Sequence, residues 1–333
     1  MKSYAPCKVI LFGEHAVVYD KLGIAAAIDQ KTFVKVSEGS EGIEITRILE
    51  PKYTKATRSQ LFGKLDEFNR MYSNKEFSSL KNLSFVDSLL VVIATTMQRY
   101  GYKNVKVNIS FENMLKGVGR SASKYSAVVL ALGNFLGHKI DAQEVSEIAY
   151  LGDVVSHGGT PSGIDTSTVT FGGFISYRKS EGIKKLDLDY KLPLVLVDSG
   201  EPARTSYTVP MVRRQREEKP EYVNAIFDKI DSISSRGVDA LRNKNFNELG
   251  SLMLENHSLL KDLGVSTPKL DGIVDSAMKN GALGAKLTAG GGGGCAIILA
   301  ADEDAATKIK TQFDASGFRA FNSSIGAHGA SLY

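Results

Sequence analysis

A glycine-rich turn leading into a helix is the stretch of this sequence best suited to bind phosphate. It consists of Lys116, Gly117, Val118, Gly119, Arg120, Ser121, Ala122 and Ser123. The first turn of a helix has unpaired backbone N–H groups and a partial positive charge, and glycines let an anion approach the backbone closely. Serine hydroxyls there can cap the helix, or face a metal ion or phosphate oxygens. The stretch predicts a phosphate cradle, with a tight turn capped by serine as the alternative.

Polar residues at both ends of an apolar strand near the N-terminus are further candidates. Lys8 stands just before the strand 9–12, and Glu14 and His15 stand at its exit. Loops at strand ends often carry functional groups. On the local sequence alone, an exposed lysine at a strand edge and a structural histidine remain open interpretations.

A third candidate is Asp165, in a loop over residues 157–166 that is rich in glycine, proline and serine. A carboxylate set among polar residues in such a loop could be a positioned base. The same composition is also typical of an ordinary connection. We expect a strand over 168–171 after this loop, ending at Gly172 and Gly173.

Five consecutive glycines, residues 290–294, follow Thr288 and Ala289. Such a run loses much chain entropy on folding, so it indicates close approach of the backbone to a ligand or to the cradle. A flexible hinge is the alternative. A strand over 296–300 is expected next.

The elements that must position these residues follow from hydrophobic periodicity. Residues 105–111 alternate apolar and polar side chains, which predicts a half-buried strand leading into the cradle. Apolar residues at helical spacing from 122 to 136, with Gly137 at the end, predict a helix leading out of it. Other expected elements are a β-rich opening over 3–37, mainly loops and helices over 50–100 with a buried helix at 86–100, a helix from the capping-box sequence Asp141–Glu144 to about 156, a strand at 194–197, and mainly helices over 200–280.

Composition limits the class of protein. A chain of 333 residues is long enough for two domains of ~150 residues. The net charge is +4, from 41 basic and 37 acidic residues, and the densest basic cluster, residues 213–216, is followed at once by Glu217 and Glu218. Neither feature favours nucleic-acid binding. Two cysteines and no signal-peptide or membrane-spanning pattern favour a cytoplasmic protein without disulfides.

Two common nucleotide-binding patterns are not supported. The sequence lacks the P-loop pattern and the protein-kinase signatures. Gly117, Gly119 and Ala122 do match the G-x-G-x-x-A spacing of a dinucleotide site. However, Asp141, which would have to end a second strand and bind a ribose, begins a helix instead. A Rossmann dehydrogenase is therefore a remote alternative.

Five stretches together resemble the GHMP kinases, and within that family the branch that phosphorylates mevalonate. They occur in the family's order across nearly the whole chain. They are residues 5–19 with the sequence Phe-Gly-Glu-His-Ala-Val-Val-Tyr, the cradle 117–123, Pro161–Asp165, Leu260–Pro268 with its Gly-Val-Ser, and Lys286–Thr288 with the glycine run.

This resemblance implies an α+β fold of two domains, residues 1–189 with the nucleotide site and 190–333, with the active site in the cleft between them. It implies ATP and Mg²⁺ as cofactors and phosphorylation of the 5-hydroxyl of mevalonate in isoprenoid biosynthesis. Phosphoryl transfer depends mainly on positioning and electrostatic stabilisation. The implied roles are catalysis by Asp165 and Lys8, nucleotide binding by residues 116–123, substrate binding by Glu14, His15, Arg204, Thr205, Ala289, Gly291 and Gly292, and metal binding by Ser121 and Asp153.

The sequence departs from the family pattern at several positions. Cys7 replaces a glycine, Ala289-Gly290 reverses the usual order, and Asp153 stands nearest to the position of the second magnesium ligand, usually a glutamate. Arg120 replaces the first of two serines. Because guanidinium groups bind phosphate well, Arg120 suggests an acceptor that already carries a phosphate, mevalonate 3-phosphate. Binding of ATP or of a carboxylate by Arg120 is the alternative.

Two further expectations come from the fold. A GHMP-like fold can also serve as a sensor without catalysis, although suitable residue types at positions 8, 121 and 165 favour an enzyme. The resemblance also implies a possible homodimer. A small-molecule substrate is expected, with no nucleic acid or membrane partner.

Overall fold

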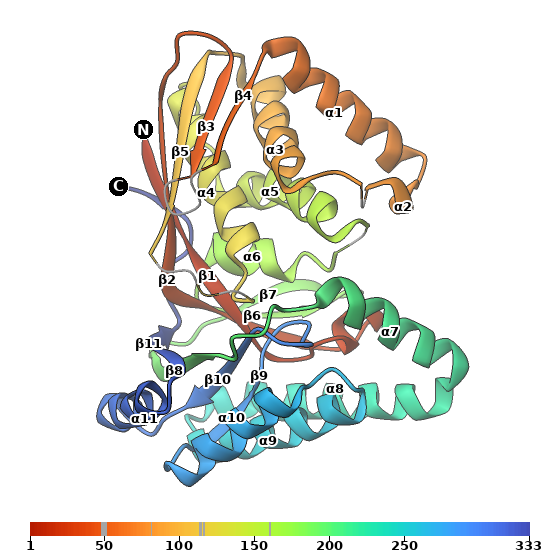
Figure 1. Ribbon diagram of the computed structural model, residues 1–333, viewed down its shortest axis with the longest axis vertical. Helices are drawn as coiled ribbons and strands as arrows, with labels where there is room; N and C mark the ends of the chain where they lie inside the picture. The colour runs from red at the N-terminus through yellow and green to blue at the C-terminus, as the bar shows by residue number, and fades with distance from the viewer. Residues whose placement is uncertain (48–51, 81, 113–114, 116, 160) are drawn as a thin grey trace.

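The computed structural model describes residues 1–47, 52–80, 82–112, 115, 117–159 and 161–333 (Figure 1). The strands are β1 (Lys2–Phe12), β2 (Gly23–Glu38), β3 (Ile43–Arg47), β4 (Lys52–Ala56), β5 (Val105–Phe111), β6 (Phe174–Arg178), β7 (Gly182–Leu186), β8 (Leu192–Asp198), β9 (Gly284–Leu287), β10 (Cys295–Leu299), β11 (Arg319–Ile325) and β12 (Ser331–Leu332). The helices are η1 (Ala16–Tyr19, a 3₁₀ helix), α1 (Arg58–Ser73), α2 (Phe77–Leu80), α3 (Phe85–Tyr100), α4 (Arg120–Phe135), α5 (Ala142–His157), α6 (Ile164–Phe171), α7 (Thr205–Glu218), α8 (Pro220–Arg242), α9 (Phe246–Asp262), α10 (Pro268–Lys279) and α11 (Glu303–Ala315).

The strands form one connected sheet in the order β4-β3-β5-β2-β11-β8-β10-β9, with β1 pairing β2 and β12, and β6 pairing β2 and β7. Only the β3–β5 pair is parallel among the described strands. The long strand β2 joins the two halves of the molecule, because it pairs with β5 in one half and with β11 in the other. In Figure 1 these halves lie above and below the crossing of β1 and β2.

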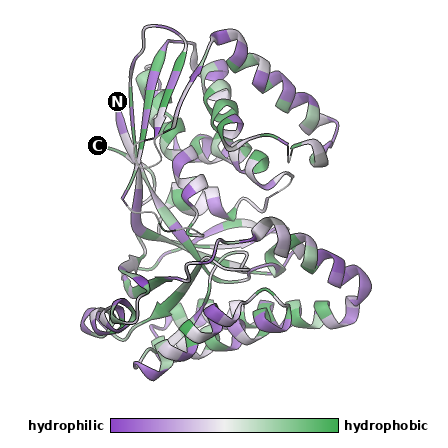
Figure 2. Ribbon diagram, in the orientation of Figure 1, coloured by the Kyte–Doolittle hydropathy of each residue, from purple (hydrophilic) through white to green (hydrophobic). Residues whose placement is uncertain are grey.

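Two hydrophobic cores lie on this sheet. The first packs α1, α3, α4 and α5 against the strands of the upper half, and the second packs α8 to α11 against the strands of the lower half. Figure 2 shows hydrophobic residues along α3 and the central strands, and hydrophilic ones on much of α7. The predicted α+β class is confirmed. Apolar residues of the N-terminal segment, among them Val9, Leu11, Phe12 and Ile24, pack in the core of the lower half. The boundary at 189/190 stays a prediction.

The most periodic segments agree closely with the sequence. The strand predicted at 105–111 is β5, the helix predicted at 86–100 is α3, and the helix after Asp141 is α5. Each helix has a local start signal. Ser84 and Asp87 form a reciprocal capping box at α3, and Asp141 accepts a hydrogen bond from the backbone of Glu144.

Two predictions were wrong. Residues 164–171 form helix α6, not the end of a loop and a strand. The β-branched residues at positions 166 and 168–170 favour a strand by propensity. Tertiary packing overrides it, since these side chains are buried against α4 and α5 and the Thr168 hydroxyl donates to the Ile164 carbonyl at 2.6 Å. Residues 52–56, expected in loops and helices, form strand β4, which pairs with β3.

None of the described helices combines the length and the apolar character that crossing a membrane would need.

Candidate functional site

The cradle connects β5 to α4 and lies against β1. Gly119 is the N-cap residue of α4 with φ of +72°, and the backbone N–H of Lys8 donates to the Val118 carbonyl at 2.9 Å. The side chain of Lys8 passes directly over Gly119, where an added Cβ would lie 2.7 Å from Lys8 Cγ. A residue with no side chain is needed here both for the backbone conformation and for the space that Lys8 occupies.

The ammonium group of Lys8 reaches the carboxylate of Asp165. Lys8 Nζ lies 2.8 Å from Asp165 Oδ1, and the side chains are 1% and 24% exposed, respectively. Asp165 stands in the first turn of α6, where the helix dipole stabilises a negative charge. The interpretation of Lys8 as an exposed edge lysine is therefore wrong, and the carboxylate keeps access to a ligand.

A second carboxylate lies in the same charge cluster. Asp153, on α5, is buried, and its Oδ1 lies 3.6 Å from His157 Nδ1. Burial raises the pKa of Asp153 to about 6. The charges of His157 and Lys8 act in the opposite direction, and the charge of Asp165 acts in the same direction. The site thus holds two carboxylates close to Lys8, in surroundings that make a buried negative charge unfavourable.

The residues present fit a magnesium ion. Asp153 Oδ1 is buried and has no hydrogen-bond partner among the described residues, and Ser121 is half-buried in the first turn of α4. No cluster of three or more Cys, His, Asp or Glu side chains with metal-binding geometry occurs in the described part of the chain. A single carboxylate and a hydroxyl suit Mg²⁺, which usually takes one or two protein ligands and completes its shell with water and substrate phosphates.

The structure does not bring every predicted cradle residue to the site. The Ser123 hydroxyl is buried, donates to the Ala5 carbonyl at 2.8 Å and lies 2.8 Å from Thr32 Oγ1, so this side chain joins α4 to β1 and β2. Neither serine hydroxyl caps α4. The side chains of Val118 and Ala122 are buried, which leaves only their backbone for a ligand. Lys116 lies outside the described residues.

Arg120 lies at the start of α4 and stacks on β5. The centre of its guanidinium group is 4.1 Å from the centroid of the Phe111 ring. This contact explains part of the arginine's role without a second phosphate, because a guanidinium over an aromatic face is stabilised by the ring.

The glycine run approaches the cradle from the lower half. A Cβ added to Gly117 would lie 3.8 Å from the backbone nitrogen of Cys295 and 3.9 Å from Gly294 Cα. The two glycine-rich segments therefore face each other, one from each half of the molecule. The run is also hydrogen-bonded on its far side, since Gly292 N–H donates to the Val265 carbonyl at 2.8 Å, so a flexible hinge does not describe it.

Residues at the start of α7 donate hydrogen bonds to backbone carbonyls of this run. Arg204 N–H donates to the Gly291 carbonyl at 3.2 Å, and the Thr208 hydroxyl donates to the Gly290 carbonyl at 2.7 Å. A Cβ at Gly290 would lie 2.6 Å from Thr205 Oγ1. The predicted substrate residues Arg204, Thr205, Ala289, Gly291 and Gly292 are thus brought together.

Glu14 and His15 behave differently from the prediction that both line the substrate. Glu14 is buried, and its carboxylate pairs with Lys286 and accepts a hydrogen bond from Asn256 Nδ2 at 3.1 Å. His15 Nε2 donates to the Gly290 carbonyl at 3.1 Å. Both side chains therefore contact the protein around the glycine run.

Three buried polar residues around the site had no assigned role in the sequence. Lys124 on α4, Asn256 on α9 and Lys286 on β9 are all fully buried. Lys286 stands in a stretch that carried the family resemblance, but no local pattern shows which lysines are buried. Lys124 has one weak signal, since the helix around it is apolar on most of its surface.

Comparisons with known proteins identify the family and the fold. The family described as "GHMP kinases N terminal domain" matches residues 88–173, and the family described as "GHMP kinases C terminal" matches residues 238–319. A mevalonate kinase of Pyrococcus furiosus is 34% identical over 320 residues, which cover 92% of this chain and 91% of the relative. The solved structure of Methanococcus jannaschii mevalonate kinase has a TM-score of 0.80 and 30% identity, with 98% of each chain covered. The L. major mevalonate kinase in complex with R-mevalonate has a TM-score of 0.78 and 27% identity, with 99% of this chain and 97% of that chain covered.

Proposed function

The chain belongs to the GHMP kinase family, and we propose that it transfers the γ-phosphoryl group of ATP to the 5-hydroxyl of mevalonate. One observation carries the proposal: the 2.8 Å pair of Lys8 and Asp165 stands beside the N-terminus of α4, which is suited to bind phosphate. The relatives named mevalonate kinase, which match this chain over about nine tenths of their length, support this acceptor.

In this proposal Asp165 receives the proton of the acceptor hydroxyl as its oxygen attacks. A positioned general base commonly contributes ~10²–10⁴ in rate. Lys8 stabilises both the carboxylate and the negative charge that develops on the attacking oxygen, because its ammonium is buried where electrostatic interactions are weakly screened.

The cradle and α4 would bind the nucleotide through backbone N–H groups, and Ser121 and Asp153 would hold Mg²⁺. ATP supplies the phosphoryl group, and the metal ion neutralises part of the charge on its phosphates. The start of α7, the glycine run and His15 would enclose the acceptor. These residue roles are proposals that rest on the distances and hydrogen bonds given above.

The alternatives are less well supported. For mevalonate 3-phosphate, the guanidinium group of Arg120 was the motivating feature, and its contact with Phe111 accounts for part of its role without a second phosphate. A Rossmann dehydrogenase needs a parallel sheet around the cradle, whereas β5 is parallel to β3 alone and antiparallel to β2, and the other described strand pairs are antiparallel. The cytoplasmic location and the homodimer stay predictions.

An ADP-release assay with mevalonate, its 3- and 5-phosphates, galactose and homoserine tests the function. We expect the highest kcat/KM with mevalonate. Asp165→Asn should lose most turnover and keep nucleotide binding, which distinguishes an enzyme from a sensor. Efficient use of mevalonate 3-phosphate in preference to mevalonate would contradict the proposed acceptor.

A further inference from the structure

A buried ion pair joins the exit of β1 to β9. The carboxylate of Glu14 pairs with the ammonium of Lys286, and their side chains are 1% and 0% exposed. Asn256 Nδ2 donates to the second carboxylate oxygen of Glu14, and Lys286 Nζ also donates to the Leu287 carbonyl at 2.7 Å. Removing two charges from water is unfavourable unless geometry and hydrogen bonds compensate. Both carboxylate oxygens of Glu14 thus have partners within the protein.

The next residue holds the same segment at a second point. His15 Nε2 donates to the Gly290 carbonyl at 3.1 Å. Burial lowers the pKa of His15 to about 4, so the imidazole is neutral and carries its proton on Nε2. Between these points, Thr288 Oγ1 accepts from the Ile10 N–H at 3.0 Å and lies 3.1 Å from the Ile10 carbonyl. Residues 14 and 15 thus hold the beginning and the end of segment 286–290.

Both segments contain strained backbone. His15 has φ of +61° and Ala289 has φ of +65°, and each is a residue with a side chain in the left-handed region. Such conformations persist only where the surrounding structure enforces them. His15 itself joins the two segments through its bond to Gly290, and Ala289 lies between Thr288 and Gly290, which both make such bonds.

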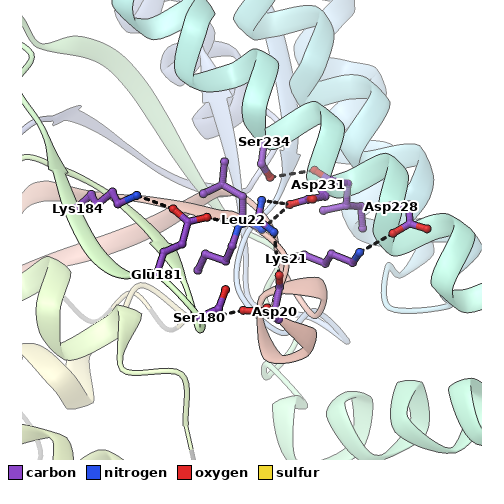
Figure 3. Close-up of polar contacts among 11 residues, drawn as sticks. Asp20, Lys21, Leu22, Ser180, Glu181, Lys184, Asp228, Asp231 and Ser234 are labelled. Carbon is purple, nitrogen blue, oxygen red and sulfur yellow. Dashed lines mark hydrogen bonds and ion pairs between the residues drawn. The ribbon is translucent and has the colours of Figure 1, made fainter.

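Residues 20–22, at the end of the loop between β1 and β2, are bonded to α8 and to the β6–β7 hairpin (Figure 3). Leu22 N–H donates to Asp231 Oδ1 of α8 at 2.6 Å. The Ser180 N–H of the β6–β7 hairpin donates to Asp20 Oδ1 at 2.7 Å, and Lys21 pairs with Asp228. With this end fixed, the position of residues 13–15 depends on the contacts of Glu14 and His15.

We propose that the Glu14–Lys286 ion pair and the His15–Gly290 hydrogen bond act together as a clamp that holds residues 289–294 at the acceptor side of the site. Glu14 and Lys286 are positioning residues and do not touch the acceptor. The inference rests on the proposed function, because that function defines which ligand the glycine run encloses.

The experiment compares Glu14→Gln, Lys286→Met and the double variant. In each single variant we expect the KM for mevalonate to rise about tenfold or more, with the Kd for ATP changed less than about twofold. Hydrogen exchange at the amides of 289–294, measured without ligands, should become faster. The double variant leaves no unpaired buried charge, so its Tm should be closer to that of the wild type. Its exchange and KM should still be raised.

The double variant keeps the test valid if a single variant does not fold. Wild-type exchange and KM in the double variant would overturn the clamp, as would equal losses of ATP and acceptor affinity. The control is Glu248→Gln, which removes an exposed pair with Arg236 at 2.7 Å and should change nothing. If the wild type does not phosphorylate mevalonate, the proposed function fails, whereas the exchange result still decides the clamp.

Discussion

The side chain of Lys8 lies across Gly119 at a distance that leaves no space for a methyl group. A Cβ at position 119 would be 2.7 Å from Lys8 Cγ and 2.9 Å from Lys8 Cε. Gly119, the N-cap residue of α4, therefore also leaves the space through which the ammonium of Lys8 reaches Asp165. One glycine links the proposed nucleotide side of the site to the Lys8–Asp165 pair.

Gly119→Ala should lower kcat by at least about tenfold, because Lys8 has to move away from Asp165. The backbone strain at positive φ should also lower the free energy of unfolding by about 1–2 kcal/mol. Gly182→Ala is the matched control, since Gly182 has φ of +74° and an added Cβ would meet no atom within 4 Å. It should lose similar stability and keep full activity. Equal activity in both variants would contradict the assigned role of Gly119.

Ser121 and Ser123 should separate function from stability. Ser123→Ala removes a buried hydroxyl that donates to the Ala5 carbonyl, so we expect a loss of about 1 kcal/mol in unfolding free energy with unchanged kcat and KM for ATP. Ser121→Ala should instead lower kcat and keep the stability. The measurements are urea unfolding and steady-state kinetics for both variants. The reverse assignment of effects would show that the cradle binds its ligand through Ser123.

Parts of the site could be predicted from the sequence where a short stretch combines a hydrophobic period with a glycine-rich turn. Strand β5, the cradle and α4 follow one another in that way, and Lys8 and Asp165 lie in stretches that resemble the GHMP kinases. The Lys8–Asp165 pair itself is a tertiary contact. No local pattern in either stretch predicts that the two side chains meet at 2.8 Å.

The errors have physical causes of the same kind. Helix α6 has a β-branched sequence, and burial against neighbouring helices overrides its strand propensity. Glu14 was expected on the substrate side from the family resemblance alone, and no pattern around it shows that its carboxylate is buried. Its burial depends on Lys286, which is contributed by a distant strand. Charges that neutralise each other across the fold cannot be identified from one segment alone.

Acid should destabilise the fold through His257. Burial lowers the pKa of His257 to about 4 from its ordinary value of 6.5. The unfolded chain therefore binds a proton between these pH values while the folded chain does not. The contribution of His257 to the free energy of unfolding is complete above pH 6.5. It is lost as the pH drops toward 4, and the loss is about 3 kcal/mol at most.

Replacing the histidine tests this account of the pH dependence. Protonation at Nδ1 would break the bond that His257 accepts from the Leu287 N–H at 3.3 Å. In His257→Gln, the unfolding free energy measured by urea at several pH values should depend less steeply on pH in this window. A slope identical to that of the wild type would assign the acid sensitivity to other groups.

Asp153 should determine the magnesium requirement at the expense of stability. Its Oδ1 is buried and has no hydrogen-bond partner among the residues that the structure describes, and burial raises its pKa to about 6. An ionised carboxylate is thus unfavourable here unless a cation joins it. Asp153→Asn keeps the shape and removes the charge. We expect the Mg²⁺ concentration for half-maximal activity to rise about tenfold or more at constant ATP, while Tm stays equal or rises, as is common where a site is not optimised for stability.

Glu147→Gln, at an exposed position on the same helix, should change neither quantity. An unchanged magnesium requirement in Asp153→Asn would remove Asp153 from the metal site, and a lower Tm would show that its charge stabilises the neighbouring cations of Lys8 and His157 instead.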